Sequence, residues 1–309
     1  MQTRIVGIDA ARAVALVAMI VAHLTAPTGI AAQLLFGFPA GLFALLAGVS
    51  MQLMRARPAA FAVRGACLIA LHVALVPFAG TIEVVLGTIG VCMIALAWTP
   101  RLDSAWLAWL VAALTLGSAA LSPSASPYPP LMWAALMVAG MVFARRVPLR
   151  SGAVVGLALF AADVALRWWF PLPALLDASG HTGGLVDVVG TGGASIGICS
   201  LCCLAGRWLG WLAPLGRMTL TLYCLHVVSS PFVGLWVTLA GATAMAAAWL
   251  HVFRRGPVEE AVRRIVGAGV HCFEKWKGKG NEEDRRIDAG SGDARSAAGV
   301  GDGVANIRR

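Results

Sequence analysis

Charged residues are scarce in this 309-residue chain. Asp, Glu, Lys and Arg together make up 13% of it, whereas hydrophobic residues make up 59% and the mean hydropathy is +0.80. A soluble domain carries about 25% charged residues, so the composition excludes a soluble globular protein, a disordered chain and a fibrous repeat. We therefore expect an all-α, polytopic integral membrane protein.

A disulfide framework is also lacking. The chain has seven cysteines, an odd number, and six of them lie in apolar runs, where we expect them to be small buried hydrophobic residues. Cys199 and Cys202 have the spacing of a metal or redox pair, but no second pair accompanies them, so we interpret them as packing residues. The segment from Gly190 to Gly193 resembles a nucleotide-binding loop, but without a βαβ context it predicts close helix packing instead.

Ten apolar runs dominate what remains. A membrane-spanning helix needs about 20 mostly apolar residues. We therefore expect about ten transmembrane helices, and the approximate limits of the runs are 8–27, 34–54, 64–80, 82–99, 105–121, 131–145, 152–170, 184–205, 213–233 and 234–253.

Lysine and arginine are absent from the loops that follow the odd-numbered runs. The loops after the even-numbered runs and both ends of the chain carry nearly all of them, so the positive-inside rule predicts that both termini are cytoplasmic in a multi-pass plasma-membrane protein. We therefore attribute the net charge of +9 to basic residues in cytoplasmic loops and termini, and we expect no nucleic-acid partner. Arg167 is the exception on the outer side. Asp163 lies four residues earlier, and this spacing predicts an ion pair with a structural role.

The composition changes at residue 254, which gives three predicted parts. Residues 1–253 form the transmembrane domain. Residues 254–279 are expected to be a cytoplasmic amphipathic helix that lies on the inner membrane surface, although a partner-binding helix would have the same pattern. Residues 280–309 are charged and glycine-rich without apolar periodicity, and we expect them to be disordered. We find no internal repeat.

Ionisable residues inside the membrane are costly and therefore mark functional sites. Arg12 and His23 are eleven residues apart, which places them on one helix face about 16 Å apart. Arg12 would bind an anion at the cytoplasmic end, where Asp9 would orient it, and His23 would transfer protons deeper in the membrane. The alternative is an arginine anchor at the membrane surface and a histidine that only packs.

Two further histidines reach a similar depth. His72 and His226 each lie about 12–13 Å into the membrane, counted from Arg64 and Arg217. If these histidines and His23 face one cavity, that cavity is polar. The alternative is three separate histidines that bond to their own neighbours. A three-histidine zinc site would need all three to face one point, and we expect no metal.

These residues also carry a resemblance to a known family. The opening Arg4-x4-Asp9-x2-Arg12, followed by His23, resembles the start of transmembrane acyltransferases, which include the heparan-α-glucosaminide N-acetyltransferase group and bacterial glycan O-acyltransferases. The Arg-x10-His spacing is a motif of the O-acyltransferase branch, whereas the rest is most similar to actinobacterial members of the N-acetyltransferase-like branch. The further similar segments are 43–50, Tyr128-Pro129 with Trp133 and Gly140, His181-Thr182-Gly183 with Gly190 and Gly193, 216–226, and Arg255-Gly256-Pro257-x-Glu259.

The chain departs from the family pattern at two places. Ala13 stands where the family usually has glycine, and the stretch from His226 to Arg254 is shorter than usual. The second departure concerns the final helix, on which full activity would depend.

The resemblance implies transfer of an acyl group, usually acetyl, from cytoplasmic acetyl-CoA. The acceptor would be a hydroxyl or amine of a sugar, glycan or lipid-linked molecule, typically on the outer side, and membrane lipids would surround the protein. His23 would act as a general base or carry the acetyl group covalently, and His181 would contact the acceptor. The residues expected to bind the donor are Arg12, Arg64, Arg217 and Arg255, and those expected to line the path are Asp9, His72 and His226.

Two other classes of protein fit parts of this pattern. A proton-coupled transporter of small molecules or lipids would also place ionisable groups at mid-membrane, but paired inverted repeats, which many transporters show, are not found. A non-catalytic membrane scaffold would use the C-terminal segment to bind partners and would not need the buried histidines.

Overall fold

The computed structural model describes residues 5–35, 37–54, 56–121 and 128–272, and the regular elements in these ranges are all helices. A last helix over 257–272, here called the C-terminal helix, follows α12. Arg4, the end of the predicted amphipathic helix and the predicted disordered tail lie outside the described residues. The other helices are α1 (Val6–Thr25), α2 (Gly29–Leu35), α3 (Phe38–Met54), α4 (Pro58–Leu75), η1 (Val76–Phe78), α5 (Leu86–Ala95), η2 (Thr99–Arg101), α6 (Ser104–Leu121), α7 (Pro130–Arg146), α8 (Leu149–Trp169), η3 (Ala174–Leu176), α9 (Leu185–Ala205), η4 (Gly206–Leu212), α10 (Ala213–Arg217), α11 (Thr219–Ser229) and α12 (Leu235–Val252).

Seven segments of the described chain are long and apolar enough to cross a membrane. The predicted all-helical class is therefore confirmed for the described residues, and the seven apolar segments are consistent with a polytopic membrane protein. Each of the ten predicted apolar runs is largely helical, but α5 and α11 are shorter than the length that a straight span requires, and α7, with 17 residues, is not among the seven segments. The seven segments are Val6–Thr25, Gly29–Met54, Pro58–Phe78, Ser104–Leu121, Leu149–Trp169, Leu185–Arg217 and Leu235–Val252.

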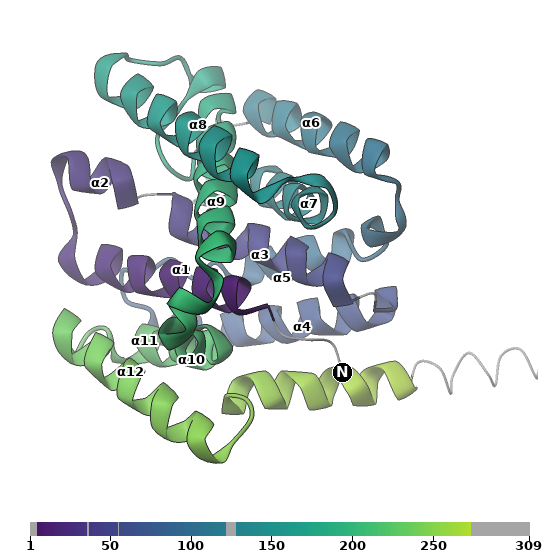
Figure 1. Cartoon of the computed structure of the whole chain (residues 1–309), viewed down its shortest axis with the longest axis vertical. Coiled ribbons are helices and arrows are strands. Elements are labelled where there is room, and N and C mark those ends of the chain that lie inside the picture. Colours follow the sequence, from purple (N-terminus) through teal and green to yellow (C-terminus); the bar gives the residue numbers. More distant parts are fainter. Residues whose placement is uncertain (1–4, 36, 55, 122–127, 273–309) are drawn as a thin grey trace, which may run out of the picture.

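The centre of the bundle consists of α1, α3, α7 and α9, with α6 and α8 on one side and α4, α12 and the C-terminal helix on the other (Figure 1). Trp133, Leu16 and Leu45 are fully buried there. Small residues allow the backbones to approach closely. A methyl group added at Gly48 of α3 would overlap the carbonyl oxygen of Met137 on α7.

The ninth predicted run is interrupted in the structure. Met218 leaves the helical conformation, with φ −114° and ψ 20°, so that α10 ends and α11 begins around it. Gly216, just before this break, packs so tightly on α1 that a methyl group there would overlap the carbonyl oxygen of Asp9. The break thus seats the short helix α10 directly on the arginine-bearing end of α1.

Large apolar side chains cover the outside of the bundle. Trp106, Trp109, Trp169 and Trp236 are each more than 60% exposed. Such surface is unfavourable in water and favourable in lipid, where tryptophan is enriched at the membrane interface. The exposed tryptophans therefore agree with the membrane character that the helices indicate.

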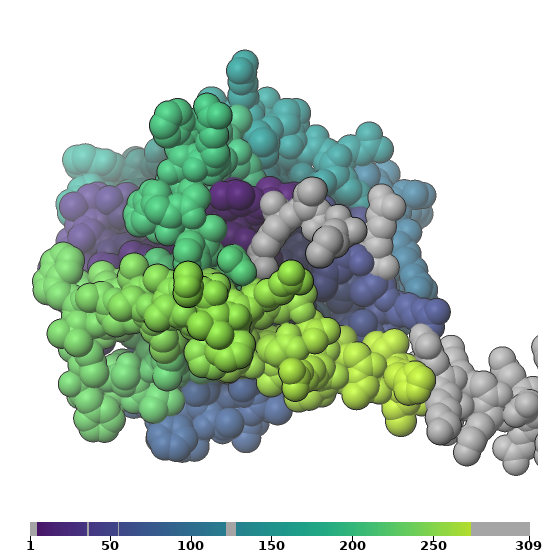
Figure 2. Space-filling model, turned by 60° about the horizontal axis from the view of Figure 1, so that its bottom comes forward, coloured from purple at the N-terminus to yellow at the C-terminus, as the bar shows by residue number. Residues whose placement is uncertain are grey.

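The C-terminal helix packs against the bundle along one side. Val262 is buried, and a methyl group at Gly269 would lie 3.1 Å from Val63 of α4. Figure 2 shows this helix running across the near face, beside α12. Its apolar face is thus partly covered by protein, and contact of the remaining face with the membrane surface stays a prediction.

Candidate functional site

The four arginines predicted to bind the donor line one cavity of about 460 Å³. They come from separate parts of the chain: Arg12 from α1, Arg64 from α4, Arg217 from α10, and Arg255 from the segment before the C-terminal helix. Arg263 of the C-terminal helix also lines this arginine cavity. Guanidinium groups that converge from several helices form a site for an anion, and phosphate is the anion whose geometry they match well.

Arg12 is held in place by two side chains. Its Nη1 donates to Asp9 Oδ1 at 3.0 Å, and its Nη2 donates to Ser50 Oγ at 2.7 Å. Ser50 in turn donates to the carbonyl oxygen of Leu46 at 2.7 Å, so its hydroxyl lone pairs point toward Arg12. The predicted contact between Asp9 and Arg12 is present. Ser50 of α3, which sequence reasoning did not place in the site, completes the support.

Glu259 lines the arginine cavity. Its carboxylate accepts hydrogen bonds from the backbone N–H groups of Leu220 and Thr221, at 2.7 and 3.1 Å, and from the hydroxyl of Thr221 at 2.5 Å. A carboxylate is stabilised at this position because the first N–H groups of a helix lack partners and the helix dipole is positive there. Glu259 therefore fastens the C-terminal helix to the start of α11. Its role was not predicted from the sequence.

A pair of histidines lies near the arginine cavity. Tyr223 of α11 lines the cavity, and His226 lies three residues further along the same helix, which is about 4.5 Å of axial rise. His226 Nε2 lies 3.2 Å from Nδ1 of His23 on α1. The two ring planes are nearly parallel, with an angle of 7° between them, and the centroids are 5.5 Å apart, so the rings meet edge to edge through these nitrogens.

The histidine pair imposes a constraint on protonation. A hydrogen bond between two imidazoles needs one N–H and one lone pair, so at least one of the two rings is neutral. His23 uses Nδ1 in this bond, which leaves Nε2 as its nitrogen for a substrate. The pair can therefore accept a proton and hold the accepting ring in a fixed orientation.

His181 occupies the loop between α8 and α9. Its ring packs on Tyr128 and Trp133, with centroid distances of 5.0 and 5.7 Å. Burial, and then repulsion from His23, lower the pKa of His181 to about 4, so this imidazole is neutral at physiological pH. Its Nδ1 is buried without a hydrogen-bond partner. His181 thus combines a neutral ring with an unused polar atom, as a substrate-binding histidine would.

Asp187 fixes the conformation of this loop. Its carboxylate accepts from the backbone N–H groups of Thr182 and Gly183, at 2.9 and 3.0 Å, and from the Thr191 hydroxyl at 3.1 Å. These bonds hold the residues next to His181, whose φ of +72° is unusual for a residue other than glycine. The signal in the sequence was the buried acid at the start of an apolar helix, but its partners could not be identified from spacing.

The third predicted histidine stands apart. The ring of His72 packs against α5, where a methyl group at Gly87 would lie 2.9 Å from its Cγ. Asp9, His72 and His226 are not among the residues that line the arginine cavity in the described part of the chain, although Asp9 contacts Arg12 and His226 lies one turn beyond Tyr223. Among the described residues, no three His, Cys, Asp or Glu side chains are grouped to hold a metal ion.

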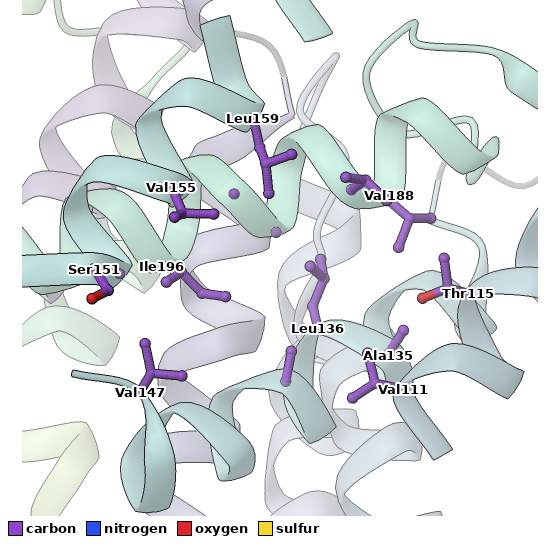
Figure 3. A pocket seen from close by; sticks show the side chains of 16 residues that line it. Val111, Thr115, Ala135, Leu136, Val147, Ser151, Val155, Leu159, Val188 and Ile196 are labelled. Atoms are coloured by element: carbon purple, nitrogen blue, oxygen red, sulfur yellow. The ribbon is translucent and has the colours of Figure 1, made fainter. Parts of the chain in front are cut away.

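A separate apolar cavity of about 390 Å³ lies between α6, α7, α8 and α9 (Figure 3). Val111, Leu136, Val155 and Ile196 are typical of its lining, and its residues include no ionisable side chain. Acid–base chemistry therefore has no group to use there. The arginine cavity and the histidine pair remain the better candidate for a reaction centre.

Comparison with known protein families and with curated protein sequences finds no match for this chain.

Proposed function

We propose that this protein is a membrane-bound acyltransferase that moves an acetyl group from acetyl-CoA to a hydroxyl or amine of a sugar, glycan or lipid-linked acceptor. One observation supports this most directly: Tyr223, which lines the arginine cavity, lies about one helical turn from His226 of the His23–His226 pair. An anion-binding cavity that leads to a proton-accepting pair suits a donor with phosphates at one end and a reactive thioester at the other. The resemblance of the Arg12–His23 segment to transmembrane acyltransferases agrees with this assignment.

The proposal includes a topology. About ten helices cross the plasma membrane and both termini are cytoplasmic, as the distribution of arginines indicates. The arginine cavity then opens to the cytoplasm, where the donor is found. The phosphates of CoA bind Arg255 and Arg263 at the mouth and Arg12 and Arg64 further in. The cavity volume of about 460 Å³ admits the pantetheine arm and leaves the nucleotide at the mouth.

The chemical step uses His23 as a base. As the acceptor oxygen or nitrogen attacks the thioester carbonyl, Nε2 of His23 takes its proton, the carbon–sulfur bond breaks, and the CoA thiolate leaves and recovers that proton. A second route is attack by Nε2 itself on the thioester carbonyl, which expels the CoA thiolate and gives an acetyl-imidazole; the acceptor then attacks that acetyl group, the bond from its carbonyl carbon to Nε2 breaks, and the acceptor proton passes to the thiolate. His226 holds the ring in both routes, and His181 contacts the acceptor. Rapid acid quenching with labelled acetyl-CoA separates the two, because only the second leaves label on the protein.

The test of the proposed function is acetyl transfer by purified protein in liposomes that contain a lipid and glycan extract. We expect wild type to transfer label from acetyl-CoA, and His23→Ala to lose transfer while it still binds CoA. His251→Ala is the matched control, because His251 is an exposed histidine at the end of α12. Normal turnover by His23→Ala would refute the assignment of His23. Folded wild type that neither binds CoA nor transfers label would favour the proton-coupled transporter.

A further inference from the structure

A second polar cavity, of about 560 Å³, lies at the other end of α1 from the arginine cavity. Arg12 is near the start of α1, whereas this outer cavity involves α2, which follows the end of α1, and the connection from α8 to α9 (Figure 1). Its lining residues are Gln33, Arg167, Phe170, Pro171, Leu172, Asp177, Ala178, Ser179 and Gly180.

Arg167 is the cationic residue of this cavity, and its predicted ion pair with Asp163 is present. Its Nη2 donates to Asp163 Oδ2 at 2.6 Å and to the carbonyl oxygen of Gln33 at 3.1 Å. Both of these bonds use one nitrogen of the guanidinium. The side chain of Arg167 is only 7% exposed, and its Nε is buried without a hydrogen-bond partner. A buried donor without a partner costs free energy, and a ligand that accepts from it removes that cost.

The rest of the lining is suited to a sugar. Asp177 faces the same cavity as Arg167, and its Oδ1 accepts the backbone N–H of Ser179 at 2.7 Å, which shapes the loop. A carboxylate can accept hydrogen bonds from sugar hydroxyls. Phe170 is 59% exposed and presents an apolar surface on which the C–H face of a sugar ring can pack. A lipid headgroup alone would not use this combination.

The outer cavity is continuous with the His181 loop. Ser179 and Gly180 line the cavity, and His181 is the next residue. A molecule bound in this cavity therefore contacts the loop residues that directly precede the predicted acceptor-side histidine. The arginine cavity lies at the far end of α1, so the two cavities can hold two substrates at once.

We propose that the outer cavity binds an anionic sugar, with its carboxylate or phosphate on Arg167, its hydroxyls on Asp177 and its ring on Phe170. This inference rests on the proposed transferase function, since it names the chemical class of the acceptor. It also explains why an arginine is kept on the outer side, against the positive-inside distribution.

Binding measured without acetyl-CoA tests this proposal independently of transfer. The protein is reconstituted in nanodiscs of zwitterionic lipid and titrated with a disaccharide that ends in glucuronate and with a matched one that ends in glucose. We expect the glucuronate probe to bind at least about tenfold more tightly than the neutral probe, because a charge-assisted pair is the stronger contact. His23→Ala should bind both probes as wild type does, so a failure of transfer and a failure of recognition remain distinguishable.

Two variants separate binding from support of the fold. Asp163→Asn with Arg167→Gln removes the ion pair without leaving a buried charge, and we expect it to reduce glucuronate affinity to that of the neutral probe. Asp163→Asn alone leaves Arg167 charged, and we expect glucuronate to bind more tightly than to wild type. A purely structural pair would instead make both variants less stable, with no change in probe affinity. Equal affinity for the two probes in wild type would overturn the proposal.

A lipid headgroup is the competing source of the anion. Nanodiscs that contain phosphatidylglycerol provide that arm of the experiment. If the anionic lipid blocks glucuronate binding in wild type, the headgroup occupies Arg167 and the sugar assignment is wrong. If glucuronate binds equally in both kinds of nanodisc, the sugar assignment is supported. Glucose 6-phosphate, titrated in parallel, shows whether phosphate or carboxylate is preferred.

Discussion

Replacing His226 with leucine tests whether the histidine pair acts as a unit. His226 is only 2% exposed, and its Nε2 lies 3.2 Å from Nδ1 of His23. A leucine side chain fills most of the space that the His226 side chain occupies, but it cannot make this hydrogen bond. The ring of His23 therefore loses its fixed orientation. A buried hydrogen bond contributes about 0.5–1.5 kcal/mol. Loss of a fixed general base adds to this, and we expect kcat to fall about 10- to 100-fold, which is about 1.4–2.7 kcal/mol of barrier.

The pattern across kinetic constants distinguishes a positioning residue from a binding residue. The arginine cavity is intact in His226→Leu, so the KM for acetyl-CoA should stay within about twofold of wild type. His226→Gln restores a hydrogen-bonding group, and we expect it to recover much of the lost kcat. His251→Leu is the control at an exposed position. A rise in KM with unchanged kcat would refute the positioning role, and unchanged values of both would refute any role of the pair.

Three further predictions concern the packing, the donor and the loop. Gly48→Ala should lower the free energy of unfolding by about 1–3 kcal/mol, because its methyl group meets the Met137 carbonyl oxygen; a stable variant in thermal unfolding would contradict the close approach. Arg64→Gln should raise the KM for acetyl-CoA about tenfold and leave kcat nearly unchanged, whereas Arg150→Gln, at an exposed site, should change neither. The unfolded state binds a proton at His181 below pH 6.5, but the folded state does so only near its pKa of about 4, so acid favours unfolding. Wild type should therefore lose about 1 kcal/mol of stability between pH 7.5 and 5.5, and a His181→Gln variant that loses as much would refute this contribution.

The helices were largely predictable from the sequence because membrane spans need long apolar runs. The run 82–99 was predicted as one span, yet α5 covers only Leu86–Ala95. Hydropathy cannot detect such breaks, since the residues around a break are as apolar as those within a helix. The interruption at Met218 depends on Gly216 meeting the backbone of α1, a contact between segments about 200 residues apart. Such contacts leave no periodic signal.

The candidate site was predictable in its parts but not in its assembly. Charge at the predicted cytoplasmic ends of helices was sufficient to select Arg12, Arg64 and Arg217, and the structure brings them to one cavity. The contact of His23 with His226 could not be predicted, because helix rotation is set by packing against all neighbours. Glu259 could not be recognised either, since its partners are backbone groups, which every sequence has.

The contact between His23 and His226 has a consequence for how the protein is made. The two residues are 203 positions apart, on the first and the eleventh α-helix. At a synthesis rate of about 5–20 residues per second, about 10–40 s pass between the emergence of the first histidine and that of the second. A chain that ends before α11 carries Arg12 and His23 on α1 but lacks His226, the residue that orients the ring of His23. Chains that end before α11 therefore cannot assemble the proposed reaction centre, and its chemistry begins only after α11 has been inserted.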